Sequence, residues 1–194
     1  MNKDTFDENF FQQTRRTTKR VIDDKSIDSV KNINISGFDG EELEKICSLH
    51  KKLLRCAMLK NKSNEVGMLV DLKDWSEIIV YGTENGITLK TDRSAHALIC
   101  TAPKNSLLFF HNHPRNSCFS EVDLESFLTS DAIMMMSVVC NSGRLYYLLK
   151  LKDFDKHAAL TYYDTIYERT ENGSVQEFLR TCSSIGLKLI YGGE

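Results

Sequence analysis

Residues 107–123 read LLFFHNHPRNSCFSEVD, and this stretch predicts more about fold and chemistry than any other part of the chain. Its first four residues are apolar, as is typical of a buried strand. His111 and His113 follow two residues apart, and alternate residues of a strand point to the same face. Pro114 cannot extend the ladder of hydrogen bonds and turns the chain away. The sequence therefore predicts two imidazoles that project together where a strand ends.

The second half of the stretch predicts a third ligand. Ser120 is a favourable N-cap, so a helix should begin there, and Asp123 then lies on its first turn, facing the two imidazoles. Two imidazole nitrogens and one carboxylate oxygen form a three-ligand set. Zinc in such a set keeps its fourth position for water, which is typical of a catalytic site. We therefore expect His111, His113 and Asp123 to bind Zn²⁺.

A zinc hydrolase also needs a group that takes a proton from water and passes it to the leaving amine. Glu65 opens the apolar run EVGMLV at residues 65–70, which is typical of a strand. A neighbouring strand could bring its carboxylate over the metal. Spacing alone does not select Glu65 from the other carboxylates of the chain.

These residues together resemble the JAMM motif of the JAMM (MPN-plus, JAB-domain) zinc metalloproteases, in their bacterial or phage form. The motif consists of a glutamate on an early strand, a histidine-x-histidine-proline turn and a serine-x-x-aspartate on the next helix. The resemblance covers residues 60–150 approximately. It implies that the histidines and the aspartate bind zinc, that the glutamate acts as acid and base, and that the serine stabilises the oxyanion. By position these residues are His111, His113, Asp123, Glu65 and Ser120.

The chain departs from the family pattern at one place. Five residues separate Pro114 from Ser120, where the family has six. The shorter loop leaves Ser117 as a second candidate for the serine, although only Ser120 keeps the serine-x-x-aspartate spacing. Cys118 lies in the same loop and is expected to have no catalytic role. Arg115 and Asn116 are expected either to contact substrate at the rim of the site or to be solvated.

Outward from this stretch, the chain divides into three regions. Residues 1–38 are polar without a clear period, which predicts a flexible or loosely docked N-terminal arm. Residues 39–62 have apolar positions three and four apart after a capping Asp39, which predicts an amphipathic helix packed on the core. Residues 63–194 are expected to form the catalytic domain with C-terminal helices.

Within the third region, the pattern predicts alternating strands and helices. Strands are expected at 66–70, 77–81, 87–90, 107–110, 133–139 and 144–151, and helices at 94–102, 120–129, 154–171 and 175–182. A turn at 141–143 joins two of the strands into a hairpin. This order predicts an α/β fold with a mixed sheet flanked by helices. The resemblance implies the MPN (JAB)-like form of that fold, with cytidine-deaminase-like layering.

Composition limits the class of protein. Hydrophobic residues make up 41% and charged residues 27%, as in a soluble globular protein. The formal net charge is −2, which disfavours nucleic acid as a partner, although a small basic cluster lies at residues 15–20. We find no signal peptide or apolar run long enough to span a membrane, so a cytoplasmic location without membrane contact is expected.

The expected function is hydrolysis of a peptide or isopeptide bond of a protein or peptide substrate. The resemblance implies ubiquitin-like conjugates or precursors as candidate substrates, and an activating partner or a homodimer as candidate assemblies. The alternative from another class is a non-hydrolytic MPN scaffold that binds proteins; a nucleic-acid-associated role is the weaker alternative. Scaffold members of the family typically lack metal ligands, whereas this chain keeps the whole set.

Overall fold

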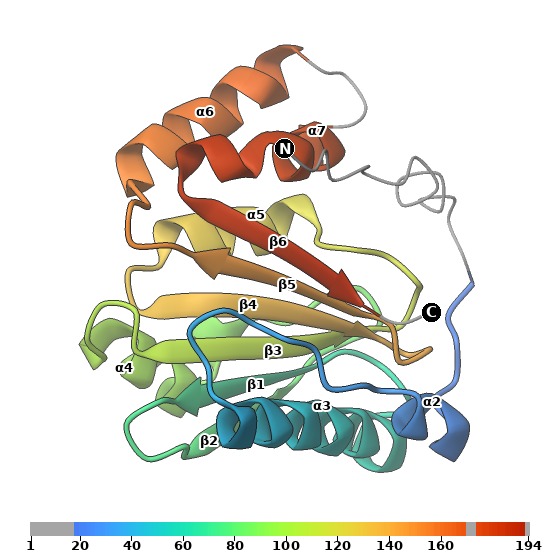
Figure 1. Ribbon diagram of the computed structural model, residues 1–194. Helices are drawn as coiled ribbons and strands as arrows, with labels where there is room; N and C mark the ends of the chain where they lie inside the picture. Colours follow the sequence, from blue (N-terminus) through green and yellow to red (C-terminus); the bar gives the residue numbers. More distant parts are fainter. Residues whose placement is uncertain (1–17, 170–173, 193–194) are drawn as a thin grey trace.

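A six-stranded sheet forms the centre of the protein in the computed structural model, which describes residues 18–169 and 174–192 (Figure 1). The strands lie in the order β2-β1-β3-β4-β5-β6. β3 and β4 are parallel and the other neighbouring pairs are antiparallel. The strands are β1 (Val66–Asp71), β2 (Glu77–Tyr81), β3 (Leu107–His113), β4 (Ile133–Cys140), β5 (Leu145–Lys150) and β6 (Leu187–Gly192). The predicted α/β class with a mixed sheet is confirmed.

Helices cover both faces of this sheet (Figure 1). One face packs against the N-terminal helices and the other against the later ones. The first layer contains α2 (Asp24–Asp28) and α3 (Gly40–Lys60). The second contains α4 (Arg93–Thr101), α5 (Glu121–Thr129), α6 (Lys156–Arg169) and α7 (Ser174–Thr181). The described residues also form two short 3₁₀ helices, η1 (Leu89–Thr91) and η2 (Cys182–Ile185).

Alternation along the strands divides the core in two. Phe109 and Met136 face the α5 layer, whereas their neighbours Phe110 and Met135 face α3. All four side chains are at most 5% exposed. The same period of two places His111 and His113 on the α5 side with Phe109. The site residues of β3 are thus directed by the strand that fills the core.

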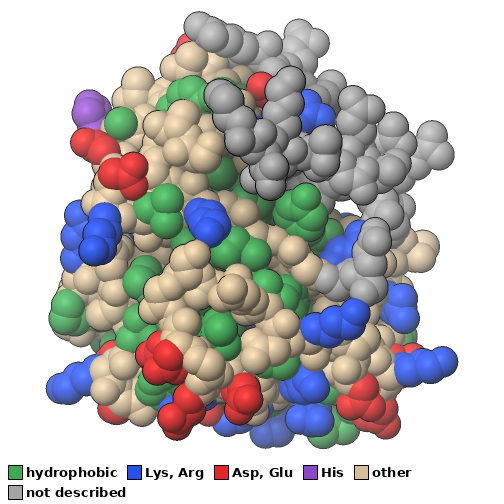
Figure 2. All heavy atoms as spheres, viewed as in Figure 1, with side chains coloured by type: hydrophobic (Ala, Val, Ile, Leu, Met, Phe, Trp, Pro, Cys, Tyr) green, Lys and Arg blue, Asp and Glu red, His purple; other side chains and the backbone are tan. Residues whose placement is uncertain are grey.

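The helix predicted for residues 39–62 is confirmed as α3. Asp39 accepts a hydrogen bond from the Glu42 amide, and the Glu42 carboxylate accepts one from the Asp39 amide, forming a capping box. Leu53 and Leu54 are fully buried against the sheet. Burial of each such side chain contributes about 1.5–3 kcal/mol to the free energy of unfolding. Figure 2 shows charged side chains of both signs along the outer surface of α3, on the side of the helix that faces away from the sheet.

The expected arm at residues 1–38 is wrong for the part that the structure describes, residues 18–38. Ile22, Ile27, Val30 and Ile35 are each at most 3% exposed and belong to the core under α3. They lie at irregular intervals in a mostly polar segment, so the sequence did not predict their burial. Residues 1–17, which include part of the basic cluster, lie outside the described residues.

Two further elements differ from the sequence prediction. Residues 87–90 were predicted as a strand, but Leu89–Thr91 form η1, and Ile87 and Leu89 face a cavity instead of pairing. Strand β6 was not predicted; it pairs antiparallel with β5 and forms one edge of the sheet. The predicted helices of the second layer and the β4–β5 hairpin are confirmed. None of the described helices has the length and apolar character of a membrane span.

His50 of α3 gives the fold a dependence on pH. The ring is fully buried, its Nδ1 lies 2.8 Å from the Ile46 carbonyl oxygen, and its Nε2 lies 2.7 Å from the Ser137 hydroxyl. Burial lowers the pKa of His50 to about 4. The unfolded chain takes up this proton near pH 6.5, whereas the folded chain does so only near pH 4. The contribution of neutral His50 to the free energy of unfolding is therefore fully present above pH 6.5 and is lost as the pH falls.

We expect this loss to reach roughly 3 kcal/mol of unfolding free energy between pH 6.5 and pH 4. Urea unfolding of wild type and His50→Gln across that range measures it, because glutamine does not titrate. The difference in unfolding free energy between the two proteins should shrink as the pH falls. A difference that stays constant from pH 7 to pH 4 would contradict a neutral, buried His50.

Candidate metal centre

The structure brings His111, His113 and Asp123 together at the end of β3. The two Nε2 atoms are 3.1 Å apart. Asp123 Oδ1 lies 3.2 Å from His111 Nε2, and Oδ2 lies 3.4 Å from His113 Nε2. One ligand atom from each residue lies within 4.8 Å of the others, so the group could hold a metal ion. The predicted ligand set is therefore one cluster in space, on the predicted elements.

His113 is oriented by its other ring nitrogen. Nδ1 lies 3.0 Å from the Ser117 hydroxyl and 3.2 Å from the Ser117 carbonyl oxygen. A proton on Nδ1 that is donated to the carbonyl leaves the lone pair of Nε2 facing the cluster. Outer hydrogen bonds of this kind fix the tautomer of ligating histidines. Ser117, the alternative candidate for the catalytic serine, thus lies behind the candidate ligand His113.

His111 is oriented by packing. Its ring stacks on Phe109, with centroids 5.1 Å apart and planes 9° from parallel. Its Nδ1 is buried without a hydrogen-bond partner among the described residues. The Nε2 atom, in contrast, faces Asp123 and His113. The donor chemistry of the group therefore fits a cation: two imidazole nitrogens and a carboxylate oxygen converge on one point.

Asp123 is positioned by the first turn of α5. Its Oδ2 accepts hydrogen bonds from the Ser120 amide at 2.7 Å and from the Ser120 hydroxyl at 2.6 Å. The Ser120 oxygen accepts one from the Asp123 amide, which completes a capping box. Ser120 thus directs the candidate ligand carboxylate in this structure, and its hydroxyl donates to Asp123. A role for Ser120 at an oxyanion stays a prediction.

Charge interactions hold the cluster together. Burial favours the neutral form of Asp123, but His111 and His113 outweigh it and hold its pKa well below the usual range. Burial likewise opposes the charged form of His113, yet the hydrogen bond and charge of Asp123, with the charge of Glu65, raise the pKa of the imidazole. The Asp123 carboxylate thus stays ionised beside the two imidazoles.

Glu65 lies on the same face, just before β1. Gly67 pairs with His111 in antiparallel register, and two residues further this register places Glu65 beside His113. Its side chain is only 9% exposed. Burial raises the pKa of Glu65 to about 7, and the Asp123 charge adds to this effect, while His113 and Arg115 oppose it. The predicted acid/base residue therefore reaches the predicted ligands through pairing of two strands.

Buried amides connect the strands behind the cluster. Asn112, between the two histidines, accepts a hydrogen bond from the Val66 amide at 2.7 Å. Its own amide group donates to the Asn64 carbonyl at 3.2 Å and to Asn141 Oδ1 at 2.7 Å. Asn141 in turn donates from its backbone amide to the His113 carbonyl. The network fixes the residues on both sides of Glu65 against β3, and no pattern in the sequence predicted it.

The N-terminal segment completes this network. Asn141 Nδ2 donates to the carbonyls of Arg20 and Ser63, at 2.7 and 2.9 Å. The Arg20 amide donates to the Pro114 carbonyl at 2.8 Å, and the Ile22 amide to the Ser63 hydroxyl at 3.0 Å. Residues 20–22 therefore contact the loops that follow His113 and precede Glu65.

Replacing Asn112 with alanine should cost roughly 3 kcal/mol of unfolding free energy, because the change leaves buried partners unsatisfied. The exposed Asn34→Ala is the matched control and should change stability by less than about 0.5 kcal/mol. Chemical unfolding of the three proteins at one pH makes the comparison. A loss below about 1 kcal/mol for Asn112→Ala would mean that the network contributes little to the fold.

A cavity of about 710 Å³ opens at the cluster. Glu65 and the three candidate ligands lie along it, together with residues of α4, α5 and the segment 84–90. Arg115 also lines it, and its guanidinium lies 3.4 Å from the Glu84 carboxylate across the rim. A substrate could therefore reach the ligands and Glu65 from the same space.

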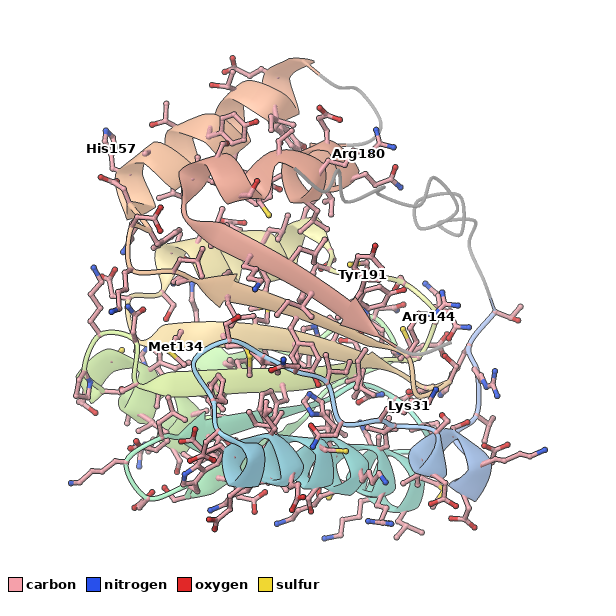
Figure 3. The ribbon with its side chains drawn as sticks, in the orientation of Figure 1. Lys31, Met134, Arg144, His157, Arg180 and Tyr191 are labelled. Atoms are coloured by element: carbon pink, nitrogen blue, oxygen red, sulfur yellow. The ribbon has the colours of Figure 1, made fainter. Side chains whose placement is uncertain are left out.

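The remaining candidates lie outside the cluster. Burial raises the pKa of the Cys118 thiol, which disfavours a nucleophilic thiolate. His96 is exposed on α4 and lines the cavity, and His50 is structural. His157 is exposed near the start of α6, on the outer side of the helix layer (Figure 3).

Comparisons of the chain with models of known protein families, with curated proteins and with solved structures found no match.

Proposed function

We propose that this chain is a zinc-dependent hydrolase of peptide or isopeptide bonds, of the JAMM type, with an MPN-like form of the α/β fold. The observation that carries the proposal is the position of Glu65. One cavity is lined by the candidate acid/base residue, which directly precedes β1, and by the three candidate ligands, which come from β3 and α5. Each belongs to the motif that the sequence resembles, and their position around one cavity supports the proposal.

The roles of the residues follow from their positions. His111, His113 and Asp123 would hold zinc, with Ser117 and Ser120 orienting two of them. A zinc ion held there would supply Lewis acidity at neutral pH. The Glu65 carboxylate would take a proton from the attacking water and pass it to the leaving nitrogen.

The hydrolase proposal accounts for more of these features than the scaffold alternative. A protein-binding module needs neither three converging ligands nor a buried carboxylate beside them, since burial of an unpaired acid is costly. A nucleic-acid-associated role has no support in the net charge of −2.

Cleavage of a peptide library tests the proposal, because a library of many sequences does not require the substrate to be chosen in advance. Zinc-loaded wild type and His111→Ala, purified in the same way, are incubated with unmodified peptides prepared from a whole proteome. New amino termini are then identified by mass spectrometry. We expect termini that appear with wild type, disappear with a zinc chelator and are absent with His111→Ala. The same set of termini from both proteins would indicate a contaminating protease and would contradict the proposal.

A further inference from the structure

The cavity at the cluster continues well beyond the candidate ligands. It runs along β3 and β4 between α4 and α5, as far as Ile133 and Ser130. Its volume of about 710 Å³ lies within the range of pockets that enclose small organic ligands. Space for a scissile bond alone would require much less. The chemistry of the remaining space therefore carries information about the substrate.

Beneath this space lie apolar side chains of the core, which are almost fully buried and begin at the candidate ligand His111. Phe109, which stacks on the His111 ring, is paired in register with Met136 of the neighbouring strand. Both residues border the cavity, as does Ile133 at the start of β4, but all three are at most 5% exposed and leave little surface for a ligand to cover. The apolar surroundings of the cavity thus begin at the candidate metal centre, because Phe109 is in direct contact with the His111 ring.

The walls add further apolar side chains. Ile99 of α4 and Ile87 and Leu89 of the preceding segment line the cavity and are only partly buried. Val122, beside the ligand Asp123, also lines it and is 66% exposed. Charged residues line the cavity as well: Glu84, Lys90, Arg115 and Glu125. A peptide backbone can meet such charges while an apolar side chain meets Ile87, Leu89 and Ile99.

We propose that this cavity receives a bulky apolar side chain of the substrate, on a residue next to the cleaved bond. The inference rests on the proposed hydrolase function and narrows its substrate class. A diglycine tail, as in ubiquitin-like proteins, has no side chain with which to cover the partly exposed Ile87, Leu89 and Ile99. Burial of a leucine or phenylalanine side chain there should tighten binding by about 10- to 100-fold relative to glycine.

Hydroxamates test this proposal, because the hydroxamate group binds zinc and the attached side chain probes the cavity. Two probe sets are compared by calorimetry on the zinc-loaded chain, with the side chain on the acyl side or on the leaving side of the hydroxamate. Each set contains a glycine, a leucine and a phenylalanine form. In at least one set, we expect the leucine or phenylalanine form to bind at least about 10-fold tighter than the glycine form.

Variants then assign the effect to the cavity. Ile99→Glu should reduce the ratio of apolar to glycine affinity to about one, and the smaller change Ile99→Ala should reduce it partly. The matched control is Leu59→Glu, since Leu59 is 74% exposed on α3, on the opposite face of the sheet. It should leave the ratio as in wild type.

The possible failures are distinguishable. Equal binding of glycine, leucine and phenylalanine forms in both sets would overturn the apolar substrate class and leave the hydrolase proposal intact. A ratio that is unchanged in Ile99→Glu would place the apolar contact elsewhere and would also overturn it. A zinc-loaded chain that binds none of the hydroxamates would contradict the proposed function, and this inference with it.

Discussion

Glu65→Gln should lower the rate of peptide hydrolysis by about 10²- to 10⁴-fold, because glutamine cannot take up or return the proton that the reaction moves. The amide has nearly the same shape as the carboxylate, and Glu65 is not among the three converging ligands. The zinc content of Glu65→Gln should therefore equal that of wild type. Steady-state rates on a peptide found by the library experiment, with zinc content measured on the same samples, make the comparison.

Glu84→Gln is the matched control for this substitution. Glu84 lines the same cavity, but it lies at the rim with a side chain 43% exposed and pairs with Arg115. Its loss should change the rate far less than the loss of Glu65. Equal, small effects of the two substitutions would show that Glu65 is not the acid/base residue, even if the metal centre is real.

His113→Ala should weaken zinc binding by more than the roughly 10- to 100-fold that loss of an outer-shell partner costs. Removing His113 takes away one of three ligand atoms, whereas Ser117→Ala removes only a hydroxyl behind His113 and should have the smaller effect. Competition titration with a zinc-binding dye measures both affinities. The exposed His96→Ala is the control and should bind zinc as wild type does.

Zinc should also stabilise the folded chain, because the site exists only when β3 and α5 are in place. Binding adds about 2.7 kcal/mol to the unfolding free energy at a free concentration of roughly 100 times Kd. The shift of the melting temperature with zinc should be present in wild type and His96→Ala and absent in His113→Ala. Equal shifts in all three proteins would place the zinc at another site.

The sequence predicted those parts of the site that local periodicity determines. His111 and His113 share a face because a strand alternates with a period of two. Asp123 faces them because Ser120 begins the helix, and both halves of that capping box are visible in the sequence. Glu65 could be chosen only by resemblance, since its place depends on the register between β1 and β3, which no local pattern encodes.

The parts that the sequence did not predict depend on distant contacts. Asn112 and Asn141 meet across 29 residues, and their amides give no periodic signal. Ile22 and Ile35 lie in a mostly polar segment, and they are buried because α3 and the sheet lie against them. Residues 87–90 alternate as a strand does, but Leu89 turns to the cavity and no neighbouring strand pairs with them. The apolar cavity itself arises from the separation of α4 and α5, which the sequence leaves undetermined.

The most direct test of the metal centre is a crystal structure of the zinc-loaded chain, with the ion located by anomalous scattering at the zinc absorption edge. We expect one ion, about 2.0–2.1 Å from Nε2 of His111 and of His113 and about 2.0–2.2 Å from a carboxylate oxygen of Asp123. An ion bound by other residues, or a well-ordered cluster without any ion after loading, would contradict the metal centre and the function proposed from it.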